Sequence, residues 1–280
     1  MEVNEIENKI NEIKSIEEIE RSLIKRYRKH IWSKFVKSIK EYELINKGDK
    51  IASAISGGKD SLILAKLLQE IQKYGNVDFE LEFIAMDPGY NEENRKRLEE
   101  NCAYLGIPVK IFDTDVFKVA DEIAGNYPCY ICARMRRGAL YAKAEELGCN
   151  KLALGHHFND VIETTMLNIL KAGCFKTMMP KLKSDNFENM EIIRPLYQVR
   201  EDYIIRWINW TGLKALDCAC KVSSKKLGSS RADIKELIEK LGEDHVNLDI
   251  SIFRAAQNVN LDMVLGYESA GVKRSFLDDY

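Results

Sequence analysis

The sequence has no hydrophobic run that approaches the roughly 20 residues a helix needs to cross a bilayer. Its first 20 residues, MEVNEIENKINEIKSIEEIE, are charged throughout and lack the apolar stretch of a secretory signal. With 45% hydrophobic and 31% charged residues, the 280-residue chain has a globular composition and is long enough to bury a substantial core. We therefore expect a cytoplasmic protein with no membrane partner.

A large net charge is also missing. The formal charge of −2 argues against a protein that coats nucleic acid by bulk electrostatics. One local exception is the segment 21–40, RSLIKRYRKHIWSKFVKSIK, which contains eight Lys or Arg residues and no acid, interleaved with Tyr27, Trp32 and Phe35. Such a run is either a solvated helix face or a grip on phosphates.

Internal repeats are absent, and short apolar segments alternate with segments of helical periodicity. Strands are expected at 51–55, 81–86, 108–113 and 151–155. Helices are expected at 61–74, 91–106, 133–148 and 159–173, the last with Asn159 as its N-cap. The alternation predicts an α/β fold in which helices cover both faces of a parallel sheet, with ligands beyond the carboxyl ends of the strands.

Three parts are expected along the chain. They are a helical N-terminal arm at 1–48, the α/β domain at 49–226 and a small C-terminal helical region at 227–280. Within the domain, residues 180–196 have the pattern of a hairpin, and the last residues, 268–280, are expected to form a loose tail.

The segment SAISGGKDS, residues 53–61, joins an expected strand to an expected helix. Gly57 and Gly58 allow backbone N–H groups to face outward at the positive end of that helix, which makes an anion site. Lys59 adds a mobile positive charge, and the flanking serines add hydroxyl donors. Asp60 is out of place beside an anion unless a metal ion neutralises it, which suggests Mg²⁺.

The Walker spacing G-x-x-x-x-G-K-[ST] is missing, because two adjacent glycines precede Lys59 directly. Hydrolysis at the γ-phosphate of a nucleotide is therefore not the expected reaction. The alternative is a plain glycine turn between a strand and a helix.

The turn SGGKDS resembles the PP-loop signature of ATP pyrophosphatases, which transfer AMP from ATP to a substrate oxygen and release pyrophosphate. Four more segments, PCYICARMRRGALY, LALGHHFNDVIETTMLNIL, MMPKLKSD and IRPLYQVRE, are similar, in the same order, to segments of the TtcA-type tRNA 2-thiocytidine synthetases and their TtuA-type relatives. TtuA-type proteins also carry zinc-binding cysteine pairs near both ends. This chain has no cysteine before Cys102 or after Cys220, which favours the TtcA-type branch.

The resemblance implies a Rossmann-like, adenine nucleotide alpha hydrolase-like PP-loop domain that binds ATP and Mg²⁺. The implied ATP contacts are Ala54, Ser56, Gly57, Gly58, Lys59, Asp60, Ser61, Met86 and Gly155. Asp60 and Asp160 are the expected Mg²⁺ ligands, and Asp160 corresponds to a family residue that matters for catalysis. The simpler interpretation of Asp160 is a favourable charge at a helix N-terminus, and that of Met86 is a core residue.

Seven cysteines in a reducing cytoplasm are not expected to form disulfides. Three are scattered and are interpreted as ordinary small buried residues: Cys102, Cys149 and Cys174. The other four form a C-x-x-C pair, Cys129 and Cys132, and a C-x-C pair, Cys218 and Cys220. From the residues alone, the four could hold a structural zinc, or the first pair could be a redox dithiol.

The resemblance implies a [4Fe-4S] cluster instead. Its ligands would be Cys129, Cys132 and one later cysteine, Cys220 with Cys218 as the substitute, so that the fourth iron stays open for sulfur.

Basic residues follow the C-x-x-C pair at Arg134, Arg136 and Arg137, either for solubility or to place positive charge beside the cluster. Arg136 matches a catalytic basic residue that is lysine in TtuA-type enzymes; an arginine neutralises charge but does not act as a base. His156 and His157 are more readily explained as core or polar-contact residues than as metal ligands.

The resemblance thus implies an ATP-dependent tRNA sulfurtransferase that adenylates the C2 oxygen of a pyrimidine, by preference cytidine, and replaces it with sulfur. Its catalytic residues would be Asp160, Arg136, Cys129 and Cys132. The tRNA would be contacted by Lys25, Arg26, Arg28, Lys29, Arg134 and Arg137. The other expected partners are a sulfur donor, either a cysteine desulfurase product or inorganic sulfide, and a second copy of the chain in a homodimer.

Two alternatives differ in their chemistry. One is a PP-loop amide or lysine-type ligase that acts on tRNA or a small molecule and has a structural zinc. The other is a module that binds ATP or tRNA without catalysis.

Overall fold

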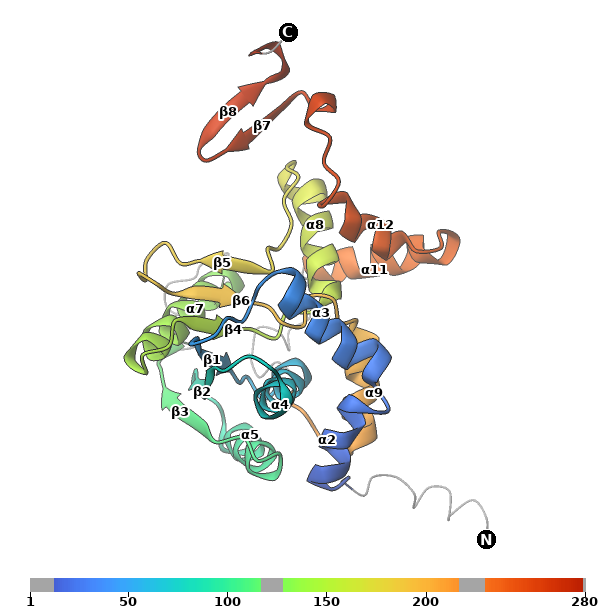
Figure 1. The fold of residues 1–280 in the computed structure, drawn as a ribbon. Helices are drawn as coiled ribbons and strands as arrows, with labels where there is room; N and C mark the ends of the chain where they lie inside the picture. Colours follow the sequence, from blue (N-terminus) through green and yellow to red (C-terminus); the bar gives the residue numbers. More distant parts are fainter. Residues whose placement is uncertain (1–12, 117–127, 217–229, 279–280) are drawn as a thin grey trace. The chain divides into compact units, whose positions relative to one another are not determined.

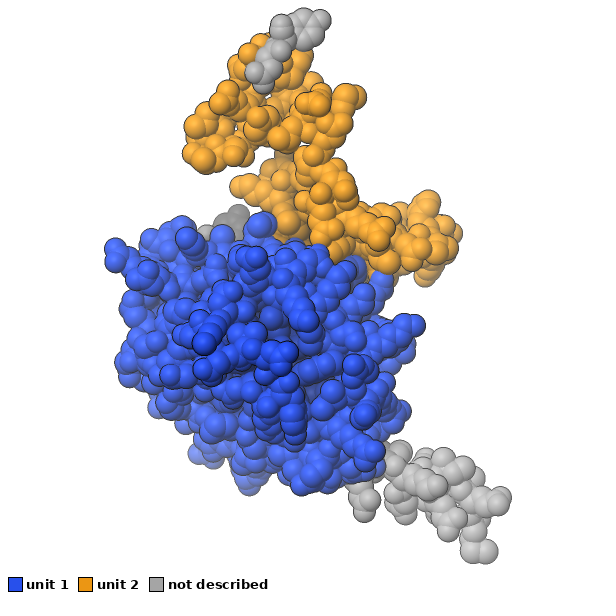
Figure 2. Space-filling model, in the orientation of Figure 1, with its two compact units in different colours: residues 1–160, 179–227 blue, residues 161–178, 228–280 orange. Residues whose placement is uncertain are grey.

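The computed structural model describes residues 13–116, 128–216 and 230–278, with residues 128–133 described by their backbone alone. It divides into two compact units, coloured separately in Figure 2. Unit 1 comprises residues 1–160 and 179–227, and unit 2 comprises 161–178 and 228–280. In the described ranges, every helix is too short or too polar to span a bilayer.

Unit 1 is built on a six-stranded sheet with the order β3-β2-β1-β4-β6-β5 (Figure 1). The strands are β1 (Lys50–Ala54), β2 (Glu80–Asp87), β3 (Val109–Asp113), β4 (Lys151–Ala153), β5 (Lys181–Lys183) and β6 (Glu191–Ile193). All neighbours pair in parallel except β5, which is antiparallel to β6. The predicted parallel α/β sheet is confirmed, and so is the hairpin, whose second strand joins the sheet.

In the described ranges, the helices of unit 1 are α2 (Ile16–Ile24), the π-helix η1 (Arg28–Trp32), α3 (Ser33–Glu41), α4 (Lys59–Tyr74), α5 (Glu92–Tyr104), α7 (Pro128–Glu146) and α9 (Glu201–Thr211). The helices expected at 61–74 and 91–106 are confirmed, whereas α7 begins at Pro128, before the expected start at residue 133. Gly212 caps the carboxyl end of α9, and its φ of 77° suits a residue without a Cβ.

Successive strand residues face opposite sides of the sheet and enter two separate cores. On one side, Ile51, Phe83 and Ile193 pack with residues of the arm, α4, α5 and α9. On the other side, Ala52 and Ile84 pack with residues of α7. Because both faces are covered, the strands read as near-continuous apolar runs.

The arm packs against α9, as Figure 1 also shows. Leu23 and Phe35 are fully buried in the core that α4 and α9 share. The indole nitrogen of Trp207 donates to Ser22 Oγ at 3.2 Å. The arm is thus held by the same core as one face of the sheet, while the three-part domain division stays a prediction.

Unit 2 contains most of α8 (Phe158–Ala172), then α11 (Ser230–Asp244) and α12 (Leu248–Ala255), joined to a two-stranded sheet. The prediction of a loose tail is wrong, because β7 (Gly266–Ser269) and β8 (Val272–Ser275) form a hairpin. Ala270 and Gly271 form its two-residue turn with φ values of 51° and 77°. Two positive φ values in succession match the right-handed twist of paired strands.

Candidate active site at the carboxyl edge of the sheet

The strand order has a switch point between β1 and β4. From β1 the chain builds outward through β2 to β3 and then returns to place β4 on the other side of β1. Since these strands are parallel, the segments that follow β1 and β4 leave the same edge in different directions. Ligands of open α/β sheets bind at this kind of switch point. The turn 55–58 and the segment 154–157 therefore flank the site that the topology favours.

The turn after β1 is held in a tight conformation. Gly57 has a φ of +78°, and a Cβ there would lie 2.5 Å from Leu216 Cδ1. The amide of Leu216 donates to the Gly57 carbonyl at 2.9 Å. Ser61 Oγ donates to the Gly58 carbonyl at 2.9 Å and accepts from the Ser56 amide at 3.1 Å. A side chain at position 57 would therefore be strained by the positive φ and would have to displace the Leu216 side chain.

Helix α4 starts from this turn at Lys59, with Gly58 as an N-cap that has no side chain to occupy the first amides. A 16-residue helix presents partial positive charge at this end. The predicted phosphate-binding residues, Ser56 to Ser61, are thus gathered at a helix N-terminus that fits a polyphosphate.

Lys59 bridges two carboxylates. Its Nζ lies 3.0 Å from Asp60 Oδ2 and 3.0 Å from Glu201 Oε1. Burial lowers the pKa of Lys59, but the two carboxylates outweigh burial and raise it, so the side chain stays charged. Glu201 begins α9 and was assigned no role from sequence, although it ends the segment IRPLYQVRE.

Asp60 has a carboxylate in which only one oxygen has a hydrogen-bond partner among the described residues. Its Oδ1 is buried and has no hydrogen-bond partner among the residues that the structure describes. Burial raises the pKa of Asp60, and the charge of Asp160 adds to this, although His157 and Lys59 act in the opposite direction. A buried carboxylate oxygen with no donor, beside a second carboxylate, fits a hard cation such as Mg²⁺.

His157 links the two aspartates. Its Nε2 lies 3.8 Å from Asp60 Oδ1, and its Nδ1 lies 3.3 Å from Asp160 Oδ2. The same oxygen of Asp160 accepts from the His157 amide at 2.9 Å. This buried histidine makes polar contacts, as the sequence interpretation favoured, and it holds the second aspartate in place.

The predicted N-cap of α8 is wrong. The helix begins at Phe158, so Asn159 lies inside it. The backbone amide of His157, just before the helix, donates to the side chain of Asp160 and not to that of Asn159. Asn159 Oδ1 accepts from the Glu201 amide at 3.0 Å, so it holds the first residue of α9. Asn159 thus joins the segment after β4 to the helix that carries Glu201.

Gly155 lets the segment after β4 approach the turn. A Cβ at this position would lie 3.1 Å from the carbonyl carbon of Asp60 and 3.2 Å from its oxygen. From the other side, the Tyr90 hydroxyl donates to the Ser56 carbonyl at 3.4 Å. Ala54 ends β1 and is half-buried, whereas the Met86 side chain is buried at the end of β2. Their contacts with ATP stay predictions.

Three predicted basic residues lie on α7. Arg134 and Arg137 are exposed and Arg136 is half-buried. Sequence reasoning missed Arg194, a buried residue that directly follows β6 at the same edge of the sheet. Burial lowers the pKa of Arg194 to about 10, and the nearby charge of Arg137 adds to the effect. Even so, its guanidinium stays charged at neutral pH.

The backbone places the C-x-x-C pair at the same edge. Cys129 and Cys132 lie in the first turn of α7, which follows β3 and leads into β4. A helix that connects parallel strands runs back along the sheet, so its first turn lies at the carboxyl edge. The thiols of these two cysteines, together with Cys218 and Cys220, lie outside the described residues.

The remaining cysteines fit the cluster less well. Burial raises the pKa of Cys102 to about 12 and that of Cys149 to about 11, which disfavours the thiolates that bind iron. Cys174 is half-buried and free, in unit 2. In the described ranges, His, Cys, Asp and Glu form no group of three suited to a metal. Cys129, Cys132 and Cys220 therefore stay the predicted ligands of the [4Fe-4S] cluster. The prediction is supported by the poorer suitability of the other cysteines as thiolate ligands.

The predicted tRNA contacts of the arm are all exposed: Lys25, Arg26, Arg28 and Lys29. Arg26 also lies over the ring of Trp210, 5.3 Å from its centroid. The arm therefore presents positive charge to solvent, as a phosphate grip requires.

Comparison with known proteins adds to this geometry. The sequence profile of the PP-loop domain matches residues 27–219. The tRNA-cytidine(32) 2-sulfurtransferase of Pelobacter propionicus is 36% identical over 238 residues, covering 84% of this chain and 88% of that protein. The protein of the same name from Alkalilimnicola ehrlichii is 37% identical over 227 residues, covering 79% and 70%.

A solved structure agrees with the fold. The U34-tRNA thiolase NcsA from Methanococcus maripaludis, determined with its [4Fe-4S] cluster, superposes with a TM-score of 0.65 and 27% identity. The superposition covers 80% of this chain and 76% of that chain.

Proposed function

We propose that this chain, which belongs to the PP-loop domain family, is an ATP-dependent tRNA 2-sulfurtransferase that acts on cytidine. The observation that carries the proposal is the shared edge of the sheet. The turn 56–61, the aspartates Asp60 and Asp160 and the first turn of the C-x-x-C helix α7 all lie at the carboxyl ends of the parallel strands. Nucleotide activation and sulfur delivery can therefore act on one base.

The first step is adenylation. The β- and γ-phosphates of ATP bind the turn 56–61, and the C2 oxygen of the base attacks the α-phosphorus. A bond forms between that oxygen and phosphorus, the bond to the bridging oxygen breaks, and pyrophosphate leaves. Lys59 would neutralise charge on the phosphates, and its two carboxylate partners hold it in position.

In the second step, hydrosulfide attacks C2 of the activated base. The bond between carbon and sulfur forms, the bond between carbon and oxygen breaks, AMP leaves with its electron pair, and the S–H proton is lost to solvent as the C=S bond forms. Arg136 would neutralise charge on the leaving phosphate. Holding the nucleotide, the base and the sulfur together supplies the proximity that this substitution needs.

Two groups would bind from outside the chain. Asp60 and Asp160 would hold Mg²⁺, which screens the polyphosphate charge. Cys129, Cys132 and Cys220, with Cys218 as the substitute, would hold a [4Fe-4S] cluster, whose open iron would hold the sulfur to be transferred.

The finer assignments follow the relatives. We propose cytidine 32 as the target, because the relatives at 36–37% identity are named for that position. A cysteine desulfurase product or inorganic sulfide would provide the sulfur, and two copies of the chain would form a dimer. The exposed basic residues of the arm would contact tRNA phosphates.

Nucleoside mass spectrometry of tRNA from cells that lack the gene tests the function. We expect 2-thiocytidine to disappear and to return with the wild-type gene but not with Cys129→Ala. Metal analysis of anaerobically purified protein is the companion measurement, with iron and labile sulfide in equal amounts expected. One zinc per chain without iron, with 2-thiocytidine unchanged, would instead favour the ligase alternative.

A further inference from the structure

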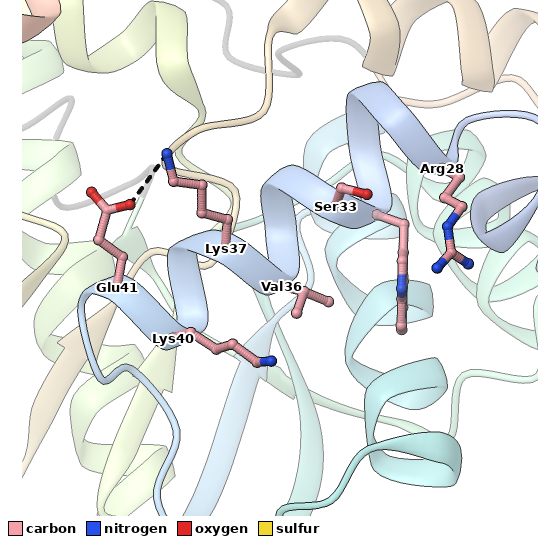
Figure 3. A pocket seen from close by; sticks show the side chains of 7 residues that line it. Arg28, Ser33, Val36, Lys37, Lys40 and Glu41 are labelled. Carbon is pink, nitrogen blue, oxygen red and sulfur yellow. Dashed lines mark ion pairs between the residues drawn. The ribbon is translucent and has the colours of Figure 1, made fainter.

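A groove of 540 Å³ opens on the surface of the arm. It is lined by Arg28, Trp32, Ser33, Val36, Lys37, Lys40 and Glu41 (Figure 3). All of these residues belong to η1 and α3, so one continuous stretch of helix builds it. We call it the Trp32 groove.

The backbone is irregular at this groove. Residues 28–32 form a π-helix between two α-helical segments, and its first and last residues, Arg28 and Trp32, both line the groove. A π-helical turn is rare and is found frequently at functional sites. This wide turn brings a guanidinium and an indole into one depression.

The three aromatic side chains of the segment 21–40 have different surroundings. Tyr27 and Phe35 are 7% and 0% exposed and belong to the core, so they are not available to stack a ligand. Trp32 is half-buried and rests against Phe35, with ring centroids 6.0 Å apart. The indole is thus fixed from behind while part of it faces the groove.

Charge in the groove is mostly positive. Arg28, Lys37 and Lys40 are exposed cations, and Glu41 is the one carboxylate in the lining. Glu41 Oε2 lies 3.4 Å from Lys37 Nζ, and Figure 3 shows Lys37 turned toward it. The surrounding exposed residues Lys25, Arg26, Lys29 and Lys34 extend the positive surface, although the whole chain carries a net charge of −2.

We propose that the Trp32 groove binds an unpaired nucleotide of the tRNA. The base stacks on the indole of Trp32, and the flanking phosphates contact Arg28, Lys37 and Lys40. A flat aromatic platform beside several cations is the arrangement with which proteins bind single-stranded nucleic acid. Glu41 weakens this site by holding Lys37. The proposal rests on the proposed function for the identity of the RNA.

The first test measures the affinity of the full-length, anaerobically prepared protein for unmodified tRNA. Trp32→Ala should weaken binding by about tenfold, and Trp32→Phe should restore most of the loss because a ring is still present. Trp32→Ala should leave the salt dependence of binding unchanged. Lys40→Ala should instead reduce the slope of log affinity against log salt by about one.

A matched pair of helix ion pairs provides the second test. Lys37 and Glu41 are spaced i,i+4 on α3, and Lys96 and Glu100 have the same spacing on α5, with 3.8 Å between their charged atoms. Glu41→Gln should free Lys37 and tighten tRNA binding by about two- to fivefold. Glu100→Gln removes the same charge from a surface outside the groove and should leave the affinity unchanged.

These outcomes separate the groove from the reaction. If Trp32→Ala and Glu41→Gln both retain wild-type tRNA affinity while the wild type makes 2-thiocytidine, the groove proposal is overturned and the function stands. If both variants shift affinity as expected but no tRNA is thiolated, the function fails and the groove stands as an RNA site. Binding to phosphatidylglycerol vesicles that only Trp32→Ala abolishes, with tRNA affinity unchanged, would also overturn it.

Discussion

Two aspartates at opposite ends of β1 have opposite surroundings. At the amino end, Asp49 accepts hydrogen bonds from the Asn46 amide at 2.6 Å and from Asn150 Nδ2 at 2.8 Å, and it pairs with Lys151 at 2.9 Å. Burial raises the pKa of Asp49, but these partners outweigh burial and lower it. At the carboxyl end, Asp60 keeps a buried oxygen with no partner in the described part of the chain, and its pKa is raised.

The two aspartates lie on either side of β1, and their surroundings separate a role in stability from a proposed role in ligand binding. The amino-end carboxylate is fully used by the fold, since it ties the residues before β1 to those before β4. The Asp60 carboxylate pairs with Lys59 through Oδ2 but keeps Oδ1 buried without a hydrogen-bond partner among the described residues, which costs the free protein stability. A buried carboxylate oxygen that lacks a hydrogen-bond partner in the free protein is available to bind a ligand.

The largest effect is expected from Asp60→Asn. The change removes the proposed Mg²⁺ ligand, so pyrophosphate release should fall by about 10²–10³-fold. The same change removes a buried charge whose pKa is raised, so the melting temperature of the nucleotide-free protein should rise. Calorimetry and a pyrophosphate assay on one preparation check both. If Asp60→Asn were inactive and also less stable than the wild type, Asp60 would contribute to stability as Asp49 does, and the two aspartates would not differ in role.

Asp49→Asn should give the opposite pattern. Breaking this buried pair leaves Lys151 with Glu191 at 3.6 Å and the Leu44 carbonyl at 2.8 Å, so the loss of stability should be about 3 kcal/mol. Urea unfolding measures it. At a temperature where the variant is folded, activity per folded molecule should equal the wild type; an active-site defect there would contradict the division of roles.

Gly155→Ala probes the close approach of the two segments that flank the site. The new methyl group would press on the Asp60 backbone at 3.1–3.2 Å, so ATP affinity should fall by about tenfold and stability by about 1–2 kcal/mol. Gly138→Ala in α7, where a Cβ meets nothing within 4 Å, is the control and should be neutral or slightly stabilising. Equal effects in the two variants would rule out a special role for Gly155.

The smallest expected effect is a difference between Asp49 and Asp60 in how each contributes to the pH dependence of stability. Asp49 has a pKa below its ordinary 3.8, so its contribution is complete above that pH and is lost as pH falls through the lowered value. Asp60 has a pKa above 3.8, so its penalty grows as pH rises through the raised value and vanishes below 3.8.

Unfolding curves of the wild type and both variants between about pH 3 and 7 measure this. The stability difference between wild type and Asp49→Asn should shrink toward the acid end, and the gain of Asp60→Asn should vanish there. A gain of Asp60→Asn that is constant across this range would show that its charge is not the cause.

Most of the sheet could be predicted from sequence because buried parallel strands and amphipathic helices have local signatures. The turn 56–61 could be predicted because its chemistry lies within six consecutive residues. Errors arose where a local signal competed with a distant partner. Asn159 has the side chain of an N-cap, yet it holds Glu201 on another helix.

The missing members of the site are distant in sequence from the turn. Glu201 pairs with Lys59, 142 residues away, and the periodicity of apolar residues does not predict a contact between residues so far apart. Arg194 is buried at the end of a strand only three residues long. The aromatic residues of the arm also differ in a way that sequence does not show. Tyr27 and Phe35 are buried, and of the three only Trp32 faces the groove.

The most direct test of the central claim is the stoichiometry of one reaction. Anaerobically prepared protein loaded with its cluster is incubated with tRNA that lacks 2-thiocytidine, ATP, Mg²⁺ and sulfide, and all products are counted. We predict one 2-thiocytidine for each AMP and each pyrophosphate, with formation about 10²–10³-fold slower in Asp60→Asn. Formation of ADP and phosphate, or AMP and pyrophosphate released with no thiolated cytidine, would contradict the account.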